Sequence, residues 1–361
     1  MIVCTNCHNP YPHDEVPFRC PICGGSFDIP SFNTFNSTEI DRTAPGIWCY
    51  RHTFELEEQD PVISLGEGKT PLVWVNAFGR SVALKLEYLN PTGSYKDRGS
   101  AVLVSFLKGR KVSQVIEDSS GNAGASLAAY AARAGVKSKV FVPATASGPK
   151  RRQIEAYGAE LVPVAGSRSD VAHAVELAAE GGQVYASHAY LPHVLTGYAT
   201  LAYELYEGLG QAPGTILIPV GQGNLLLAVG RGFQRLKAAG LINRMPVLVG
   251  VQARACAPLW AVFHYGIAGM SWVAEGETLA EGVRVKNPVR GDAFLSFMKE
   301  NSGLMVAVDE NEIIDGRIAL AHQGFYVEPT SAIVWNALQQ IIEEVSEPIV
   351  VVLTSSGLKV N

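Results

Sequence analysis

Short apolar segments that read as strands alternate with longer segments of helical periodicity along most of this chain. The strand-like segments are residues 82–86, 112–117, 139–142, 160–164, 183–186, 215–220, 246–251 and 348–353. Most are apolar nearly throughout, whereas strands with one face in water alternate with polar residues. Buried strands separated by helices are typical of parallel sheets that helices cover on both faces. Because these strands are too many for one sheet, we expect an α/β fold with two parallel-sheet domains.

The charge and apolar runs of the chain argue against several classes of protein. Its formal net charge is −5, so it has no basic excess for binding nucleic acid or an anionic membrane. No apolar run reaches the roughly 18 residues that a membrane span needs. Residues 1–4 lack the charged region and apolar stretch that begin a signal peptide. We therefore expect a cytoplasmic protein with no nucleic-acid partner and no membrane partner.

Two Cys-x-x-Cys pairs stand close together near the N-terminus. They consist of Cys4, Cys7, Cys20 and Cys23. Two such pairs let four thiolates converge on one zinc ion in a tetrahedral arrangement. Disulfides are rare in cytosolic proteins, and a redox pair would not need a second copy. His8 and His13 could replace a ligand, but four cysteines already complete the site. We expect a zinc-ribbon-like segment over residues 1–30, with structural Zn²⁺ and no position open for catalysis.

A lysine lies at a strand-to-helix corner in the run from Asn90 to Gly99, which reads Asn-Pro-Thr-Gly-Ser-Tyr-Lys-Asp-Arg-Gly. Lys96 follows the strand-like residues 82–86 and a Pro-Thr-Gly turn, and it precedes a helical segment from residue 101. The positive end of a helix disfavours an ammonium ion, and a neutral amine is the form that attacks a carbonyl cofactor. A lone lysine of this kind is more often a solvated surface residue. Whether Lys96 binds a cofactor therefore depends on what the other strand-to-helix loops of the chain contain.

Three further loops follow strands, where ligands bind in parallel sheets. The small residues from Asp118 to Ser126 let a flat ligand or a carboxylate approach backbone N–H groups. The run from Val220 to Asn224 is a phosphate cradle by the same physics. It lacks the G-K-[ST] of a Walker loop and the G-x-G-x-x-G of a dinucleotide site. With the hydroxyl-rich residues 354–356 and the lysine, these loops point to pyridoxal phosphate.

These loops resemble those of threonine synthases, which are pyridoxal phosphate enzymes of fold type II, the tryptophan-synthase-β-like class. The resemblance rests on the Lys96 run, Ser-Ser-Gly-Asn at 119–122, Gly-Gln-Gly-Asn at 221–224 and Thr-Ser-Ser-Gly-Leu-Lys at 354–359. It extends from about Ile63 to the C-terminus, and an N-terminal zinc ribbon also precedes some threonine synthases. It implies a small domain over residues 98–200 and a large cofactor-binding domain over 31–97 and 201–361.

The resemblance also assigns roles to individual residues. Lys96 would form the Schiff base with the cofactor and act as acid and base, and Asn122 would hydrogen-bond the phenolic oxygen of the ring. Thr354 would face the pyridine nitrogen, where a hydroxyl, unlike a carboxylate, cannot hold a proton; this suits elimination and replacement. The cofactor phosphate would be bound by Gly221, Gln222, Gly223, Asn224 and Leu225. The substrate would be bound by Ser94, Ser119, Ser120, Gly121, Ala123 and His188.

The implied activity is that of a carbon–oxygen lyase in threonine biosynthesis. It would convert O-phospho-L-homoserine and water to L-threonine and phosphate. An alternative is β-replacement or β-elimination on a serine- or threonine-type amino acid, as in cysteate-synthase-like or dehydratase-like enzymes. The resemblance further implies a small amino-acid substrate and a homodimer.

One segment departs from the family pattern Asn-Pro-x-Arg-x-x-Gly-x-Lys-Thr, in which the arginine grips the substrate phosphate. The matching run is residues 191–200, and it has Val194 at the arginine position and Ala199 at the lysine position. Without a cation, a phosphate loses charge-assisted hydrogen bonds of about 1.5–3 kcal/mol each. Either the substrate carries no phosphate, or another base replaces the arginine. The candidates are Lys150, Arg151, Arg152, Arg168, His188 and His193.

Overall fold

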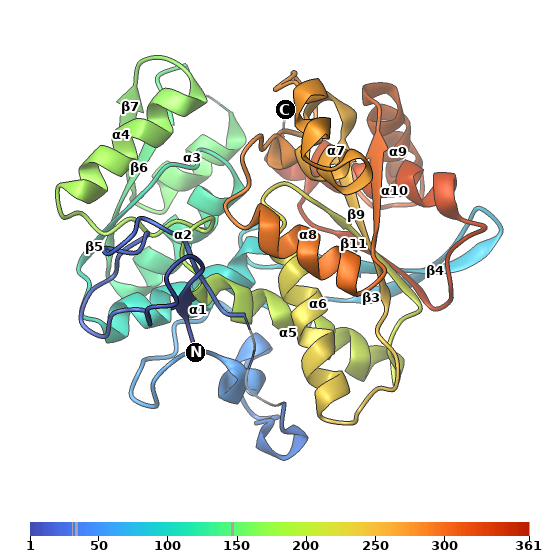
Figure 1. The fold of residues 1–361 in the computed structure, drawn as a ribbon, viewed down its shortest axis with the longest axis horizontal. Helices are drawn as coiled ribbons and strands as arrows, with labels where there is room; N and C mark the ends of the chain where they lie inside the picture. The colour runs from blue at the N-terminus through green and yellow to red at the C-terminus, as the bar shows by residue number, and fades with distance from the viewer. Residues whose placement is uncertain (31, 33–34, 146–147, 361) are drawn as a thin grey trace. The chain divides into compact units, whose positions relative to one another are not determined.

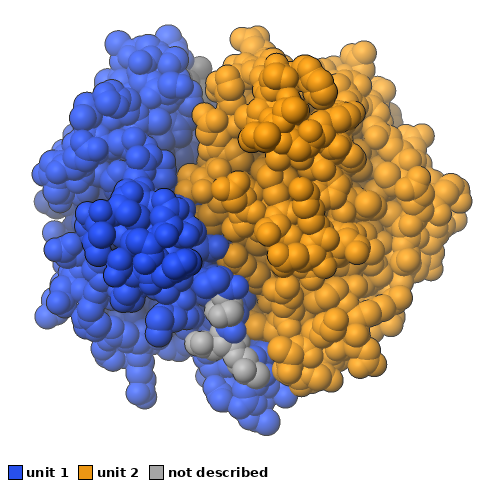
Figure 2. Space-filling model, in the orientation of Figure 1, with its two compact units in different colours: residues 1–68, 90–198, 359–361 blue, residues 69–89, 199–358 orange. Residues whose placement is uncertain are grey.

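The computed structural model describes residues 1–30, 32, 35–145 and 148–360, which form two compact units (Figure 2). Unit 1 takes in residues 1–68, 90–198 and 359–361, and unit 2 takes in residues 69–89 and 199–358. Residues 31–68 and 90–97, which the resemblance grouped with the large domain, thus lie in unit 1. Each unit has its own sheet and helices, so the predicted α/β fold class is confirmed (Figure 1).

Unit 2 is built on a six-stranded sheet in the order β10-β9-β8-β11-β4-β3. Its strands are β3 (Leu72–Ala77), β4 (Arg80–Leu86), β8 (Thr215–Pro219), β9 (Val247–Ala253), β10 (Leu304–Val308) and β11 (Ile349–Leu353). The pairs are parallel, with Val351 opposite both Leu84 and Leu217, except that β3 runs antiparallel to β4. The predicted parallel sheet is thus confirmed, with one antiparallel strand added at its edge. Phe78 and Gly79 both have positive φ, and such two-residue turns join antiparallel strands.

Helices pack against the central strands of this sheet. The helices from residue 193 onward are α5 (His193–Leu209), α6 (Asn224–Ala238), α7 (Pro258–Tyr265), α8 (Gly291–Glu300), α9 (Glu310–His322) and α10 (Pro329–Ile341). Helix α10 packs on β8, β9, β10 and β11, whereas α6 packs on β8 and β9. Every residue of β8 and β11 is buried, as expected for strands inside a covered parallel sheet.

Unit 1 contains a smaller parallel sheet in the order β5-β6-β7. Its elements are β5 (Gln114–Glu117), β6 (Lys137–Pro143), β7 (Glu160–Val164), α1 (Lys96–Gly109), α2 (Asn122–Ala134), α3 (Pro149–Ala156) and α4 (Arg168–Glu180). The strand predicted over residues 183–186 does not form. Only Tyr185 bridges to Ile116, and the chain turns away where the Ala189 N–H donates to Ser187 Oγ at 3.2 Å.

The N-terminal cysteine segment belongs to unit 1. Strands β1 (Val3–Cys4) and β2 (Phe27–Asp28) pair antiparallel, and Ile2, Phe27 and Ile29 form a small core with the cysteines. Short 3₁₀ helices are η1 (Ser37–Glu39), η2 (Gly46–Thr53), η3 (Glu87–Leu89), η4 (Arg254–Cys256), η5 (Ile267–Trp272), η6 (Glu281–Val283) and η7 (Gly357–Lys359). Among the described residues, no helix combines the length and the apolar character needed to cross a membrane.

Candidate cofactor and substrate sites

Lys96 is the first residue of α1. The turn before it closes with the Gly93 N–H donating to the Asn90 carbonyl at 2.8 Å, and Gly93 has φ +85°. The Lys96 Nζ lies 4.8 Å from the Tyr95 ring centroid and 5.8 Å from that of Tyr198. Aromatic faces attract a cation without neutralising it by proton transfer. The amine is thus positioned by two rings at a helix start, as the sequence predicts for the helix corner.

Tyr198 is fully buried against α1. A Cβ on Gly99 would lie 2.7 Å from its ring, so only glycine allows this close approach. Burial raises the pKa of Tyr198 well above its usual value, with a further contribution from Tyr95. Tyr198 therefore stays a neutral phenol beside Lys96. The sequence gives no signal for this residue, which lies far along the chain.

Asp97 joins the lysine corner to α2. Its fully buried carboxylate accepts hydrogen bonds from the Thr92 N–H at 2.7 Å, the Thr92 hydroxyl at 2.6 Å and the Ser126 hydroxyl at 2.6 Å. Burial raises the pKa of Asp97 to about 6, although these hydrogen bonds and Lys359 oppose the shift. Three charge-assisted bonds hold the residue next to Lys96 in place. Sequence reasoning missed this residue, because Ser126, which ties it to α2, lies in a remote segment.

The same network continues to His188. The Ser126 and Ser100 hydroxyls lie 2.6 Å apart, and Ser100 Oγ lies 2.8 Å from His188 Nε2. An ionised Asp97 only accepts, so Ser126 donates to it, Ser100 donates to Ser126, and the His188 Nε2–H donates to Ser100. Burial, with the nearby Lys96 charge, lowers the pKa of His188 well below its usual value. His188 is thus a buried neutral imidazole, and its predicted substrate contact stays a prediction.

The loop after β5 leads directly into α2. The Gly121 N–H donates to Ser119 Oγ at 3.3 Å, and a Cβ on Gly124 would lie only 1.8 Å from the Ser119 carbonyl oxygen. The loop is therefore tightly folded on the first turn of α2. The predicted loop residues are partly exposed and open to a ligand, namely Ser119, Ser120, Gly121, Asn122 and Ala123. Ser94 is fully buried, and its Oγ has no hydrogen-bond partner among the described residues.

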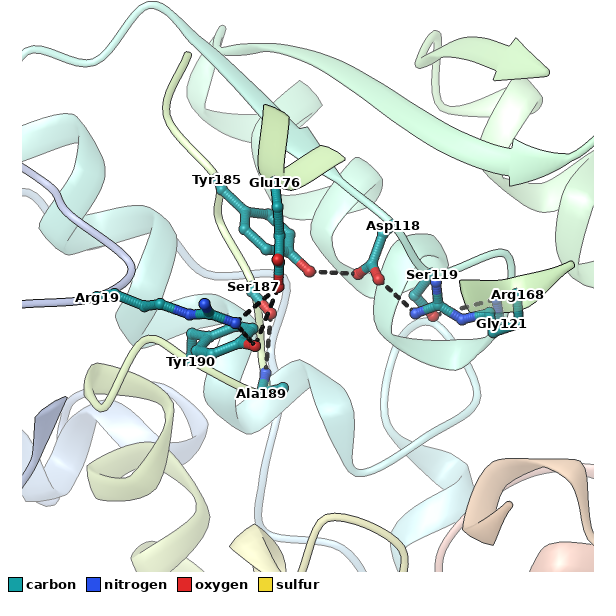
Figure 3. Close-up of polar contacts among 10 residues, drawn as sticks. All are labelled: Arg19, Asp118, Ser119, Gly121, Arg168, Glu176, Tyr185, Ser187, Ala189 and Tyr190. Atoms are coloured by element: carbon teal, nitrogen blue, oxygen red, sulfur yellow. Dashed lines mark hydrogen bonds and ion pairs between the residues drawn. The ribbon is translucent and has the colours of Figure 1, made fainter. Parts of the chain in front are cut away.

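Two carboxylates, Glu117 and Asp118, precede this loop, and sequence reasoning gave neither a role. Glu117 is buried, and burial together with Asp118 raises its pKa well above the usual value, although Arg168 and Lys96 oppose the shift. The Asp118 carboxylate pairs with Arg168, with 2.5 Å between oxygen and nitrogen, and it accepts a hydrogen bond from the Tyr185 hydroxyl at 2.7 Å (Figure 3). Arg168 is thus a cation next to the loop predicted to bind substrate.

The glycine loop of unit 2 lies between β8 and α6. Gly223 has φ +80°, and a Cβ there would lie 2.7 Å from the Phe294 ring. A Cβ on Gly221 would lie 2.9 Å from the Gly282 carbonyl oxygen. Gln222 Oε1 accepts a hydrogen bond from the Val289 N–H at 2.9 Å, which ties the loop to the segment before α8. The loop leads into the N-terminus of α6, a geometry that suits a phosphate.

Thr354 follows β11 and is buried. Its hydroxyl lies 2.9 Å from Ser331 Oγ, which also accepts a hydrogen bond from the Ser355 N–H at 2.8 Å. The Ser355 hydroxyl in turn donates to Glu328. The N-terminal turn of α10 therefore orients Thr354, a role that the sequence did not reveal for Ser331.

The four predicted metal ligands converge in unit 1. The sulfur atoms of Cys4, Cys7, Cys20 and Cys23 all lie within 4.8 Å of one another. Adjacent pairs are 3.4–3.6 Å apart, and all six cysteines of the chain are free thiols. A tetrahedral zinc ion with Zn–S bonds of about 2.3 Å needs sulfurs about 3.8 Å apart. The cluster therefore fits a closed zinc site.

The two positions that depart from the family pattern are apolar and buried in the structure. Val194 and Ala199 on α5 are both fully buried, so neither position offers a cation. Among the replacement candidates, Arg151 pairs with Glu155 at 3.5 Å, and His193 is buried and stacks on an aromatic ring. Arg168, in contrast, is paired with a residue that adjoins the Ser119 loop.

Comparisons with known proteins identify the family of the chain. The family model described as "Pyridoxal-phosphate dependent enzyme" matches residues 63–356. The chain is 32% identical to a threonine synthase of Methanocaldococcus jannaschii, covering 99% of this chain and 92% of the relative. It is 35% identical to a threonine synthase of Synechocystis, covering 87% and 82%.

Solved structures share the fold at lower identity. Maize serine racemase superposes with a TM-score of 0.69 at 19% identity, covering 81% of this chain and 88% of that one. A threonine deaminase from T.th. has a TM-score of 0.66 at 24% identity, covering 80% and 92%. The predicted fold type and family are confirmed, and the chain belongs to the pyridoxal-phosphate-dependent enzyme family.

Proposed function

We propose that this enzyme is a carbon–oxygen lyase of the threonine synthase kind, acting on O-phospho-L-homoserine and water to give L-threonine and phosphate. The observation that carries the proposal is the Lys96 corner, with its amine at the start of α1 beside two tyrosine rings. The similarity to threonine synthases over nearly the whole chain supports it.

The residues of each unit fit pyridoxal phosphate. In unit 1, Lys96 would bind the cofactor covalently, and Asn122 would face its phenolic oxygen. In unit 2, the backbone from Gly221 to Leu225 would bind the phosphate, since this glycine-rich loop leads into the N-terminus of α6. Thr354 would face the ring nitrogen. When bound, the cofactor supplies electron withdrawal from the substrate Cα.

The chain's own residues then handle protons and orientation. Lys96 would take the Cα proton of the substrate and then assist proton removal at Cβ. The backbone N–H groups from Ser119 to Ala123 would hold the substrate carboxylate. Ser331 would keep the Thr354 hydroxyl aimed, because the two oxygens lie 2.9 Å apart. The phosphate leaves from Cγ and water adds at Cβ.

Arg168 is the best candidate for the substrate phosphate, because Val194 and Ala199 offer no cation. Its guanidinium has five N–H donors, of which Asp118 needs one or two, and its side chain is 53% exposed. The same apolar positions favour a second function, namely β-elimination or β-replacement on an uncharged serine- or threonine-type substrate. In that case Arg168 would serve only to hold Asp118.

Product analysis separates these functions. The holoenzyme is incubated with O-phosphohomoserine, O-phosphoserine and threonine, and phosphate, threonine and oxoacids are measured. Phosphate and threonine in equal amounts from the first substrate are expected. Oxoacid from threonine alone would overturn the proposal in favour of the dehydratase-like function. Borohydride treatment should abolish the visible band and label Lys96, and a colourless protein after reconstitution would refute cofactor binding.

We also propose that Cys4, Cys7, Cys20 and Cys23 hold one structural Zn²⁺. Four thiolates fill a tetrahedral ion, so the metal would stabilise the N-terminal segment and take no part in the chemistry. The converging sulfurs support this proposal, and metal analysis of the purified protein tests it directly.

A further inference from the structure

Arg19 directly precedes the second cysteine pair and contacts unit 1 outside the N-terminal segment (Figure 3). Its guanidinium lies 2.9 Å from Glu176 Oε1 and donates to the Tyr190 hydroxyl at 2.7 Å. It also lies over the Tyr190 ring, 5.1 Å from the centroid. One nitrogen of the guanidinium, Nη2, makes both contacts, and the group also lies over a ring, so it fixes geometry better than a single surface ion pair does. Arg19 therefore holds Tyr190 in one orientation.

Phe18 packs beside Arg19 and orients a second tyrosine. Its ring makes edge contacts with Tyr185 at 5.4 Å and Tyr190 at 5.3 Å between centroids. Phe18 belongs to an apolar cluster with Ile116 of β5 and with α4. The backbone of Tyr185 is already bound to β5, because the Ala186 N–H donates to the Ile116 carbonyl at 2.9 Å. What Phe18 adds is the orientation of the Tyr185 ring.

The Tyr185 ring ends in the hydroxyl that holds Asp118. That hydrogen bond is 2.7 Å long, and the other carboxylate oxygen pairs with Arg168. Asp118 immediately precedes Ser119, whose carbonyl oxygen is packed so closely on α2 that a Cβ at Gly124 would lie 1.8 Å away. Because the loop is folded so tightly, a shift of Asp118 should also move the loop residues that follow it. Figure 3 shows Tyr185 between the Arg19 contacts and the Asp118–Arg168 pair.

We propose that Phe18 and Arg19 are positioning residues for the Ser119–Ala123 loop, acting through Tyr185 and Asp118. Phe18 contacts Tyr185 directly, whereas Arg19 acts through Tyr190, whose ring centroid lies 6.0 Å from that of Tyr185. The cysteine cluster then has a function beyond its own stability. Cys20 directly follows Arg19, so a metal bound by Cys20 would fix the backbone position of Arg19. The inference rests on the proposed function only in taking this loop to meet the substrate.

The experiment compares the Phe18→Ala and Arg19→Ala holoenzymes, loaded with zinc and cofactor, with wild type. Backbone hydrogen exchange is followed over residues 114–122, with β7 as the internal reference. Exchange at 114–122 should rise about two- to tenfold, the effect of losing one net hydrogen bond, with β7 unchanged. With the substrate identified by product analysis, KM should rise by a similar factor while kcat stays within about twofold.

Arg254→Ala is the matched control. Arg254 is 45% exposed against 42% for Arg19, pairs with Asp309 at 2.8 Å and lies 5.3 Å from the Trp260 ring centroid, but it is in unit 2. It should leave exchange at 114–122 and KM unchanged.

Tyr185→Phe provides a variant that keeps the apolar packing and removes only the hydroxyl. It should raise exchange at 114–122 even if the Phe18 and Arg19 variants fold poorly. Unchanged exchange there in the folded variants would overturn the inference, whatever the enzyme turns over. Raised exchange with an unchanged KM would overturn the positioning role. A wild-type enzyme without turnover would instead refute the proposed function and leave the exchange test standing.

Discussion

Replacing Gly223 by alanine should damage the proposed phosphate-binding loop, and the structure divides the expected damage into two parts. The first part is backbone strain, because Gly223 has φ +80°, a conformation that costs an alanine about 1–2 kcal/mol. The second part is steric, because the new Cβ would lie 2.7 Å from Cδ2 of the Phe294 ring. Real Cβ atoms do not approach that closely, so either the ring or the loop must move.

The burial of Phe294 sets the size of the steric part. Its side chain is fully buried in α8, so it cannot rotate into solvent, and overpacking of this kind costs about 1–3 kcal/mol. If the ring yields, unit 2 loses that stability. If the loop yields, the N–H groups that begin α6 at Asn224 move away from the proposed phosphate position, and cofactor affinity should fall. The loss in unfolding free energy and in cofactor binding together should therefore be about 2–5 kcal/mol.

Gly240→Ala isolates the strain. Gly240 has φ +72° and also lies in unit 2, but no described atom lies within 4 Å of its added Cβ. It should cost only the strain of about 1–2 kcal/mol and leave cofactor affinity unchanged. The two variants are compared by chemical unfolding and by titrating the cofactor-free protein with pyridoxal phosphate, followed by visible absorbance.

A second substitution should rescue part of the damage. Phe294→Leu in the Gly223→Ala background removes the ring atoms that overlap, and it should recover part of the lost cofactor affinity. If Gly223→Ala unfolds and binds cofactor as Gly240→Ala does, the steric argument is refuted. If the leucine variant restores nothing, the clash is not with Phe294.

Three further predictions concern other parts of the site. Burial raises the pKa of Asp97 to about 6, so the folded chain keeps a proton that the unfolded chain loses above its usual pKa of 3.8. The unfolding free energy should therefore fall by up to about 3 kcal/mol as pH rises from 4 to 6, and Asp97→Asn should remove this slope; a slope that persists contradicts the assignment. Ser331→Ala should cost about 1–3 kcal/mol in chemical unfolding, because it leaves the Ser355 N–H without its partner at 2.8 Å; no change would mean that another acceptor takes its place. The double variant Cys4→Ser, Cys20→Ser should lose zinc by metal analysis and retain cofactor colour, and unchanged zinc content would refute the metal site.

What the sequence predicted well is what a contiguous run contains. The Lys96 corner, the Gly221 loop and the Cys-x-x-Cys pairs each place their chemistry within a few residues, so local turn and helix rules reach them. The antiparallel β3 was missed because a single two-residue turn decides its direction. The prediction of a strand at 183–186 was wrong because apolar periodicity does not report how many hydrogen bonds a segment makes to its neighbour. Among the described residues, this segment forms only one bridge.

What the sequence could not predict is the support behind each run. Asp97 is held from Thr92 and Ser126, Thr354 lies beside Ser331, and Asp118 is held from Tyr185. Except for Thr92, these partners lie on segments remote in sequence, and a serine or tyrosine within a helix or a loop carries no periodic signal. In the proposed function, the cofactor is held by the contiguous runs, whereas the remote partners orient the residues that would meet the substrate. This is why the family could be predicted from short motifs, while Arg168 could be proposed in place of the missing arginine only after the fold was known.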